Sequence, residues 1–284
     1  MESMKNVVTT KEIKSYLNKS ARRIWCAGCG NGICMGALIR AIVRLQILRD
    51  KVVIVSGIGC SGRASGYLDF DSMQTPHGRP ITCATGIKLM RPEMHVIVFS
   101  GDGDIAAIGG NHLIHAARRN IDITVIVVNN QIYGMTGGQV APTTPHGALA
   151  STAPYRNIES PFDICKLALA AGATYVARST TFHVNQMVSF IERGIANRGF
   201  SLIEVMSQCP TQYGKLNNIG TPAEMLLWFK EKTINIKRSE EKTSEEIRGE
   251  IITGEFITER RPELTELYSQ LLKRAQSKRS NDET

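Results

Sequence analysis

Two short apolar runs, separated by a segment long enough for one helix, constrain what this chain can fold into. Residues 96–99 and 123–128 are β-branched and uniformly apolar, which is typical of strands covered on both faces. Residues 105–119 carry Ala and Leu at helical spacing and end in two arginines before an asparagine, which predicts one helix. The pattern is therefore βαβ, and we expect the second strand to lie parallel to the first.

An acidic side chain stands in the turn that follows the first of these strands. Residues 101–104 read Gly-Asp-Gly-Asp, at the carboxyl end of a parallel strand, where α/β sheets bind ligands. Glycines and a helix N-terminus suit a phosphate, but Asp102 would repel it. A Mg²⁺ ion removes the conflict, because it takes oxygens from carboxylates, amides and phosphates together. Asn130, at the tip of the second strand, offers an amide oxygen, and Ile132 offers a backbone carbonyl.

The same glycines also fit a dinucleotide-binding turn. Gly101, Gly103 and Ala106 match G-x-G-x-x-A, but a dinucleotide site does not place an acid between its first glycines. Residues 57–62 match G-x-G-x-x-G after a predicted strand at 52–55, yet residues 63–67 are a poor start for a helix and no acid follows about twenty residues on. A dinucleotide site is therefore the weaker interpretation.

The seven cysteines do not favour a disulfide framework. Their number is odd, residues 1–20 are polar and lack the apolar region of a signal peptide, and no run of eighteen apolar residues occurs. We therefore expect a cytoplasmic chain without a membrane span and with reduced thiols. Three of the cysteines are predicted to be small buried hydrophobes, namely Cys34, Cys83 and Cys165.

The other four cysteines stand in loops next to predicted strands and helices. Cys26 and Cys29 form a C-x-x-C before a predicted helix over residues 32–48. Cys60 lies in the glycine turn after the strand at 52–55, and Cys209 follows a predicted strand at 202–206. If these strands share one parallel sheet, their carboxyl ends lie on one edge. Four thiolates at that edge can hold a [4Fe–4S] cluster or zinc, and spacing alone does not separate the two.

The Gly-Asp-Gly turn, followed by about twenty-five residues and an Asn-Asn pair, resembles the thiamine diphosphate (ThDP) motif. Five further motifs stand with it in one order, and together they closely resemble the β subunits of 2-oxoacid:ferredoxin oxidoreductases over about residues 20–215. In these six motifs residues 25–30 read Trp-Cys-Ala-Gly-Cys-Gly, 59–63 Gly-Cys-Ser-Gly-Arg, 77–79 His-Gly-Arg, 84–88 Ala-Thr-Gly-Ile-Lys, 101–104 Gly-Asp-Gly-Asp and 133–139 Tyr-Gly-Met-Thr-Gly-Gly-Gln.

The resemblance implies a fold and a cofactor set. The fold is an α/β ThDP-binding domain over residues 20–215, with a doubly wound, mainly parallel sheet, an N-terminal arm (1–19) and a helical C-terminal extension (216–284). The implied [4Fe–4S] ligands are Cys26, Cys29, Cys60 and Cys209, and the implied Mg²⁺ ligands are Asp102, Asn130 and the Ile132 carbonyl. The implied ThDP-contacting residues are Ile58, Gly59, Cys60, Ser61, His77, Gly101, Asp102, Gly103, Asp104, Asn130, Ile132, Tyr133, Gly134, Met135 and Thr136.

The resemblance also implies the reaction. ThDP serves as electron sink for the oxidative decarboxylation of a 2-oxoacid, coenzyme A takes the acyl group, and electrons pass through the cluster to ferredoxin. An α subunit supplies the glutamate that activates ThDP, so the chain alone is expected to be inactive. Residues 133–136 are more similar to the 2-oxoglutarate branch of the family than to the pyruvate branch, where Asn usually replaces Met135. Enzymes of the 2-oxoglutarate branch make succinyl-CoA and CO₂, and the reaction can run in reverse.

Two positions depart from broad-specificity relatives, some of which carry lysines where Arg63 and Gly137 stand. Arg63 is expected to grip a substrate carboxylate or, alternatively, to tune the cluster. Met135 and Thr136 are expected to line the substrate pocket. A pyruvate or broad-specificity enzyme remains the alternative. A zinc or nucleic-acid module is a distant one, because it leaves the Asp102 turn unexplained.

The net charge of +8 is dispersed rather than clustered. We therefore expect it to steer acidic ferredoxin and not to bind nucleic acid. In the C-terminal extension, residues 221–232 predict a short helix, and residues 233–260 predict an extended arm or partly disordered linker. Residues 262–277 predict a final helix whose apolar stripe docks on the α subunit or on a symmetry mate.

Overall fold

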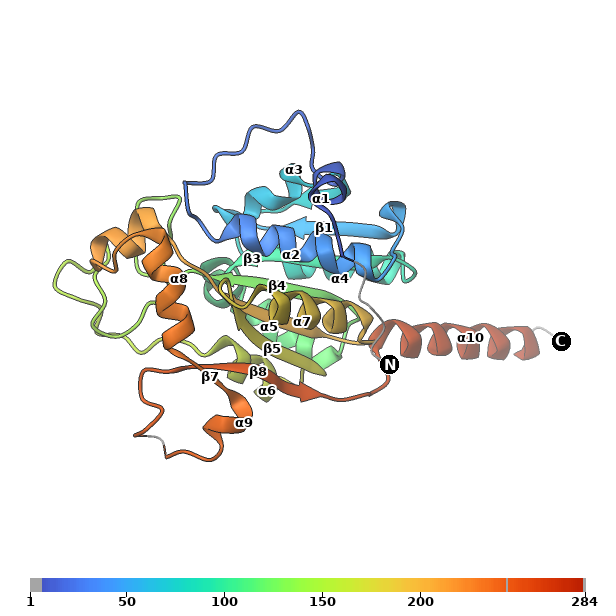
Figure 1. Ribbon diagram of the computed structural model, residues 1–284. Helices are drawn as coiled ribbons and strands as arrows, with labels where there is room; N and C mark the ends of the chain where they lie inside the picture. The colour runs from blue at the N-terminus through green and yellow to red at the C-terminus, as the bar shows by residue number, and fades with distance from the viewer. Residues whose placement is uncertain (1–6, 244, 283–284) are drawn as a thin grey trace.

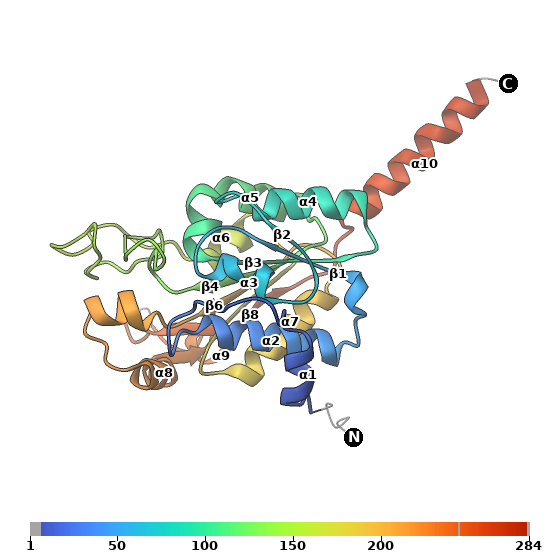
Figure 2. The same cartoon turned by 90° about the horizontal axis from the view of Figure 1, so that it is seen from above.

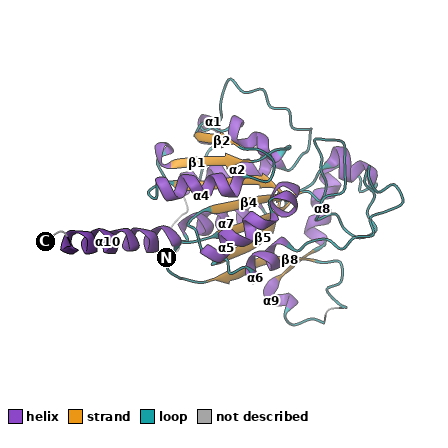
Figure 3. Cartoon of the chain, turned by 180° about the vertical axis from the view of Figure 1, so that it is seen from behind, coloured by secondary structure: helices purple, strands orange, loops and turns teal. Residues whose placement is uncertain are grey.

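The computed structural model describes residues 7–243 and 245–282, and within them an eight-stranded sheet forms the centre of the molecule (Figures 1 and 3). The strands lie in the order β2-β1-β3-β4-β6-β5-β8-β7. Neighbouring strands are parallel except β5 and β8, which are antiparallel. The strand bounds are β1 Val52–Ser56, β2 Asp71–Gln74, β3 His95–Gly101, β4 Thr124–Asn129, β5 Tyr175–Thr180, β6 Ser201–Met206, β7 Thr233–Asn235 and β8 Ile251–Thr258.

Helices cover both faces of the sheet, as the doubly wound prediction requires (Figure 2). On one face α2 and α7 pack on the sheet, and on the other face α4, α5 and α6 do so, each with its own cluster of buried apolar side chains. The helix bounds are α1 Thr10–Ser15, α2 Asn31–Arg44, α3 Ala64–Tyr67, α4 Pro80–Met90, α5 Gly110–Arg119, α6 Ile164–Ala170, α7 Val184–Ala196, α8 Pro222–Glu231, α9 Ile236–Ser239 and α10 Leu264–Asp282. The predicted mainly parallel α/β fold is confirmed.

The four predicted strands are confirmed as β1, β3, β4 and β6. They stand next to one another in the sheet, and β3 pairs with β4 in parallel, with Ile97 opposite Thr124. Strands β2 and β5 are additions that their sequences did not signal. Three of the four residues of β2 are polar and all four are exposed, as suits a sheet edge.

The predicted helix over residues 105–119 is interrupted. A wide, π-type segment, η3 (Gly103–Ile108), comes first, and α5 follows it. The junction is at Gly109, where a Cβ would lie 2.3 Å from the Asp104 carbonyl oxygen, so the chain passes too close to itself for any larger residue. Segments of this type occur often at functional sites. The end of α5 at a left-handed Asn120 agrees with the prediction.

The predicted extended arm over residues 233–260 is wrong for its last part. This segment contains β7, α9 and β8, and β8 joins the central sheet beside β5. Phe256 and Ile257 pack against the core on the α6 side, and Thr253 and Gly254 are buried. The segment is charged overall, but its apolar residues fall where one strand needs them. Residues 64–67 likewise form the short helix α3, although the sequence is a poor helix start.

Both ends of the described chain are helical. At the N-terminal arm, Ile13, Tyr16 and Leu17 pack against the core, while residues 1–6 of that arm lie outside the described residues. The predicted helices at 221–232 and 262–277 are confirmed as α8 and α10. Helix α10 projects from the body on the side opposite α8 (Figures 1 and 3). Within residues 7–243 and 245–282, no helix combines the length and hydropathy that a bilayer span requires.

Candidate functional site

The residues singled out by the sequence gather where four neighbouring parallel strands end. The turn after β1 holds Cys60, the turn after β3 holds Asp102, the turn after β4 holds Asn130, and the segment after β6 holds Cys209. Because these four strands are consecutive in the sheet, their carboxyl ends form one continuous edge. This is the edge at which open α/β sheets bind ligands.

Two adjoining cavities open at this edge and share part of their walls. All four cysteines predicted as cluster ligands line the first cavity, together with Ile24, Trp25, Asn130, Gly134, Met135, Pro210, Thr211 and Gln212. The second cavity is lined by the fifteen residues predicted to contact ThDP. The shared wall consists of Cys60, Asn130, Gly134 and Met135. A group bound in one cavity therefore lies next to a group bound in the other.

The four sulfur atoms surround the first cavity at different depths. Cys26 is exposed, Cys29 and Cys60 are half-buried, and Cys209 is buried. A Cβ at Gly134 would lie 3.4 Å from Cys209 Sγ and 3.8 Å from Cys60 Sγ, so the glycine leaves the space between them open. Burial raises the pKa of the Cys29 and Cys209 thiols, and it raises the pKa of Cys60 to about 11. These thiols would ionise if a metal centre took up their sulfur atoms.

Asp102 is a buried carboxylate at the floor of the second cavity, 3% exposed. One of its oxygens accepts the Gln131 N–H at 3.1 Å and the hydroxyl of Thr143. Burial raises the pKa of Asp102 to about 6, although the hydrogen bonds from Thr143, Gly103 and Gln131 act in the opposite direction. A cation beside this carboxylate would stabilise its charged form.

The turn after β4 carries the other predicted magnesium ligands. The Asn130 side-chain oxygen accepts the Ile132 N–H at 3.2 Å, which folds residues 130–132 into a compact turn. Gln131, between them, has a left-handed φ of +64°. Its carbonyl accepts the Thr144 hydroxyl at 2.6 Å. This turn lies directly against Asp102, because the Gln131 N–H donates to the Asp102 carboxylate.

Asp104 lines the same cavity, but protein groups already occupy its oxygens. It is 2% exposed, accepts the Gly78 N–H at 2.6 Å, and contacts the Ser100 hydroxyl and His77 Nδ1. The His77 ring stands edge-on to the ring of Tyr133, with 5.9 Å between the centroids. Asp104 therefore fixes the loop that carries His77 and presents this ring to the cavity.

Two glycines give the second cavity its shape. A Cβ at Gly103 would lie 2.3 Å from the Tyr133 ring, whose hydroxyl donates to the Gly103 carbonyl at 3.1 Å. Gly59 has a left-handed φ of +111°, and a Cβ there would have no heavy atom within 4 Å. Gly59 therefore faces open space, and a phosphate group can approach its backbone closely.

The structure brings two of the three predicted substrate-contacting residues to the cavities. Met135 is 40% exposed and lines both. Thr136 lines the second cavity and donates its hydroxyl to Gln139 at 2.5 Å. Arg63 is exposed, ends η2 (Ser61–Arg63), and lines neither of these two cavities. Burial is the largest influence on the pKa of Cys60, and the positive charge of Arg63 opposes it. Substrate contact and tuning of the cysteine site both stay predictions for Arg63.

Several residues of the site were not assigned a role from the sequence. The Thr143 hydroxyl reaches Asp102 from a long loop without periodicity, so no pattern marks it. Trp25 Nε1 donates to the Cys60 carbonyl at 2.7 Å and ties the C-x-x-C loop to the glycine turn. Its position beside Cys26 was the available signal. Gln212 lines the first cavity and carries no motif of its own.

The donor atoms of the two cavities suit different groups. The second cavity offers a buried carboxylate, an amide oxygen and an open glycine backbone, which fit a hard divalent cation together with a diphosphate. The first cavity offers four sulfur atoms, which fit an iron–sulfur cluster or zinc.

Comparison with known proteins agrees with this division. The family model for the C-terminal TPP-binding domain of thiamine pyrophosphate enzymes matches residues 57–205. The 2-oxoglutarate synthase subunit KorB of Methanocaldococcus jannaschii is 58% identical over 77% of this chain and 81% of its own length. The subunit of the same name from Archaeoglobus fulgidus is 56% identical over 73% of this chain and 76% of its own.

A solved structure extends the similarity to nearly the whole chain. The 2-oxoglutarate:ferredoxin oxidoreductase from Magnetococcus marinus, solved with 2-oxoglutarate, coenzyme A and succinyl-CoA bound, superposes with a TM-score of 0.83 at 31% identity. The match covers 93% of this chain and 90% of that one. The chain therefore belongs to the thiamine pyrophosphate enzymes and, among them, to the β subunits of the 2-oxoacid:ferredoxin oxidoreductases.

Proposed function

We propose that this chain is the β subunit of a 2-oxoglutarate:ferredoxin oxidoreductase. The complete enzyme converts 2-oxoglutarate and coenzyme A to succinyl-CoA and CO₂ and passes the electrons to ferredoxin, and it can also run in the direction of carboxylation. The observation that carries this proposal is the wall shared by the two cavities, where Cys60 and Gly134 separate a diphosphate-type site from a four-cysteine site.

The second cavity is assigned to ThDP and magnesium. Asp102, Asn130 and the Ile132 carbonyl would hold the ion, and the backbone at Gly59 and Gly103 would admit the diphosphate. Bound ThDP supplies the nucleophile and the electron sink for decarboxylation of a 2-oxoacid.

The first cavity is assigned to a [4Fe–4S] cluster held by Cys26, Cys29, Cys60 and Cys209. The cluster supplies a one-electron acceptor next to the reacting centre. Cys209 is buried and Cys29 and Cys60 are half-buried, whereas exposed Cys26 marks the side open to solvent. Zinc is the competing occupant. Absorption of anaerobically purified protein separates the two, because iron–sulfur clusters absorb in the visible range and zinc does not.

The chain is expected to require an α subunit. The residues lining the two cavities include acids only at Asp102 and Asp104, and both are engaged within the chain. The glutamate that activates ThDP would therefore come from the partner. The test is co-expression of both subunits, followed by an assay of viologen reduction that depends on 2-oxoglutarate and coenzyme A. Turnover by the isolated chain, or no turnover by the complex with any 2-oxoacid, would contradict the proposal.

The choice of 2-oxoglutarate depends on the similarity to KorB subunits and on Met135 in the shared wall. Pyruvate or broad specificity is the second candidate, favoured by the open surface around this residue, which is 40% exposed. A panel of pyruvate, 2-oxoglutarate, branched and aryl 2-oxoacids distinguishes them. A kcat/KM for pyruvate equal to or above that for 2-oxoglutarate would overturn the assignment while leaving the family unchanged.

Helix α10, at the end of the C-terminal extension over residues 216–284, is assigned to subunit docking. Helix α10 stands away from the body (Figure 2) and exposes a stripe of large apolar side chains. This stripe consists of Leu267, Tyr268, Leu271 and Leu272, which are 46–58% exposed. At its base, Leu264 packs against the core. Exposed apolar faces of this kind mark interaction sites, and the α subunit is the proposed occupant.

A further inference from the structure

A buried ion pair lies beneath the turn that carries the predicted magnesium ligands. Glu204, in the middle of β6, is 1% exposed, and its register partners are Arg178 on β5 and Val127 on β4. Side chains that pair in register point to the same face of a sheet. Asn129 follows two residues after Val127, so its side chain also lies on this face, at the strand tip.

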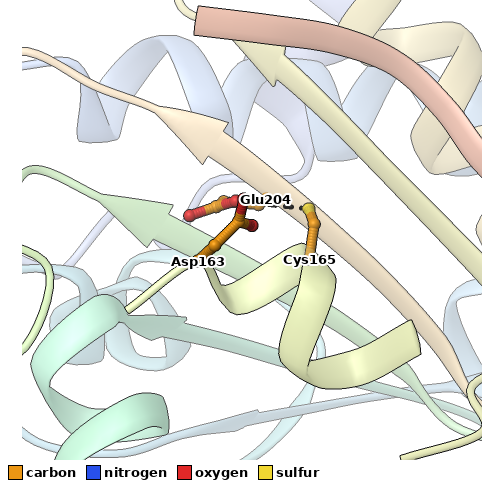
Figure 4. Close-up of side chains that lie close together, drawn as sticks. All are labelled: Asp163, Cys165 and Glu204. Atoms are coloured by element: carbon orange, nitrogen blue, oxygen red, sulfur yellow. Dashed lines mark hydrogen bonds between the residues drawn. The ribbon is translucent and has the colours of Figure 1, made fainter. Parts of the chain in front are cut away.

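The carboxylate of Glu204 is fully engaged by its neighbours. One oxygen accepts the Arg178 Nε–H at 2.6 Å and the Cys165 S–H at 3.2 Å, and the other accepts the Asn129 amide N–H at 2.7 Å. Arg178 also contacts Asp163, the N-cap of α6. Figure 4 shows Asp163, Cys165 and Glu204 converging, with the bond from Cys165 to Glu204 dashed.

This cluster has the composition of a cation site, and the guanidinium of Arg178 supplies the cation. Ligand atoms of Asp163, Cys165 and Glu204 lie within 4.8 Å of one another. Arg178 donates to both carboxylates, and its side chain is only 10% exposed. Burial strongly raises the pKa of the Cys165 thiol, which keeps it a hydrogen-bond donor. A second cation would have to displace the guanidinium, so a metal ion is not the role of this cluster.

The cluster continues by hydrogen bonds to the predicted magnesium site. Asn129 is 4% exposed, and while its amide N–H is held by Glu204, its amide oxygen accepts the Gln131 N–H at 3.1 Å. The same N–H also reaches the Asp102 carboxylate at 3.1 Å. An unbroken chain therefore leads from Arg178 through Glu204, Asn129 and Gln131 to Asp102.

We propose that Glu204 is a positioning residue for the metal site. By holding the amide of Asn129 in one orientation, it keeps the amide oxygen on Gln131 N–H. Gln131 is thereby held in its left-handed conformation, which sets the directions of the Asn130 side chain and the Ile132 carbonyl. Without Glu204 the Asn129 amide is free to rotate. The inference depends on the proposed ThDP and magnesium site.

The test measures the dissociation constant of Mg²⁺ at saturating ThDP, by calorimetry on the α–β complex after removal of metal with a chelator. Groups that form hydrogen bonds to metal ligands typically contribute about 10–100-fold to metal affinity. We expect Glu204→Gln to raise the Mg²⁺ dissociation constant at least about tenfold. Asn129→Ser, which shortens the link without removing a charge, should do the same. The double variant should add little to either single change, because both act through one hydrogen bond.

Cys165→Ala is the matched control. It removes the Cys165 hydrogen bond to the Glu204 oxygen that also accepts from Arg178. The hydrogen bond from Asn129 to the other Glu204 oxygen stays intact. It should lower the melting temperature of the complex and leave the Mg²⁺ dissociation constant unchanged.

Two outcomes would overturn the inference. One is an unchanged dissociation constant in both Glu204→Gln and Asn129→Ser, and the other is an equal rise in Cys165→Ala, which would mean general destabilisation. If Glu204→Gln does not fold, Asn129→Ser decides the question. If the unaltered complex binds neither Mg²⁺ nor ThDP, the proposed function itself fails.

Discussion

At the scale of single residues, the central tension lies in Asp102. A carboxylate that is 3% exposed is costly to keep charged. Among the described residues, hydrogen-bond donors contact it, and no ion pair involves it. A bound cation would therefore stabilise the charged form of Asp102 in the second cavity.

Replacing Asp102 by Asn should have opposite effects on binding and on stability. The pKa of Asp102 is raised to about 6 in the folded chain. Above that pH the buried charge therefore destabilises the metal-free protein, by up to about 3 kcal/mol. Asp102→Asn should weaken Mg²⁺-dependent ThDP binding at least about 100-fold and raise the melting temperature in chelator at pH 7.5.

The pH dependence follows from the same shift. Because the folded chain binds this proton more tightly than the unfolded chain, the metal-free protein should gain stability from Asp102 as the pH falls from about 6 towards 4. Asp102→Asn should lose that contribution. Thermal unfolding of both proteins across this range measures it. A variant that is less stable than the wild type at pH 7.5 in chelator would contradict the interpretation of Asp102 as a strained metal ligand.

Gly134 is the second residue with a sharp prediction. A Cβ there would already lie 3.4 Å from Cys209 Sγ, and the branched side chain of valine would reach further into the shared wall. Gly134→Val should therefore lower the iron content per protein by more than about half, with the fold retained. Gly86→Ala in α4 is the control, because a Cβ there meets nothing within 4 Å and alanine favours a helix by about 1 kcal/mol. Full iron loading in Gly134→Val would contradict the assigned cluster position.

At the scale of elements, the sequence predicted the strands and helices that a regular apolar pattern marks. It missed the features that depend on contacts between distant residues. The apolar runs at residues 96–99 and 123–128 identify β3 and β4, because a parallel strand covered on both faces is marked by a continuous apolar run. The break at Gly109 was not visible, since it arises from a close approach to the Asp104 carbonyl. Strand β8 was hidden in a charged segment because only its pairing with β5 gives it a place.

The residues of the candidate site also divide into those that a sequence motif marks and those that only the fold brings near. Cysteine and glycine motifs marked Cys60 and Gly59 because their chemistry is carried in short spacings. The hydroxyl of Thr143 on Asp102 had no such mark, since it arrives from a loop that the fold alone brings near. Arg63 was singled out by its charge, and its contact with substrate stays a prediction because it lines neither of the two cavities within this chain. Motifs therefore identify what a site contains, whereas support from distant residues becomes visible only in three dimensions.

Helix α10 yields a prediction at this scale. Leu271 is 58% exposed, so Leu271→Asp should change the stability of the isolated chain by no more than about 0.5 kcal/mol. It should weaken association with the α subunit at least about tenfold, because a charge would be buried in the apolar interface. Ser269→Asp adds the same charge on another side of the helix and should leave association nearly unchanged. Calorimetric titration of the two subunits measures both, and equal affinity for wild type and Leu271→Asp would exclude α10 as the docking element.

At the scale of the whole molecule, the excess of positive charge is expected to speed the encounter with ferredoxin. The chain carries 34 Lys and Arg against 26 Asp and Glu, giving +8 at neutral pH. A net charge of this size speeds encounter with an acidic partner and is screened by salt.

Raising the ionic strength from about 0.05 to 0.3 M should therefore slow ferredoxin reduction several-fold more than reduction of a neutral dye. Both rates are measured on the assembled enzyme with saturating 2-oxoglutarate and coenzyme A. The dye reaction serves as the control for salt effects on chemistry. Equal salt dependence of the two acceptors would show that the charge does not steer ferredoxin.

The most direct test of the whole account is anomalous X-ray scattering from crystals of the anaerobic α–β complex, grown with ThDP and with Mn²⁺ in place of Mg²⁺. The account predicts an iron peak enclosed by Cys26, Cys29, Cys60 and Cys209, and a manganese peak between Asp102 and Asn130. A zinc signal among the sulfur atoms, or manganese bound away from Asp102, would contradict it.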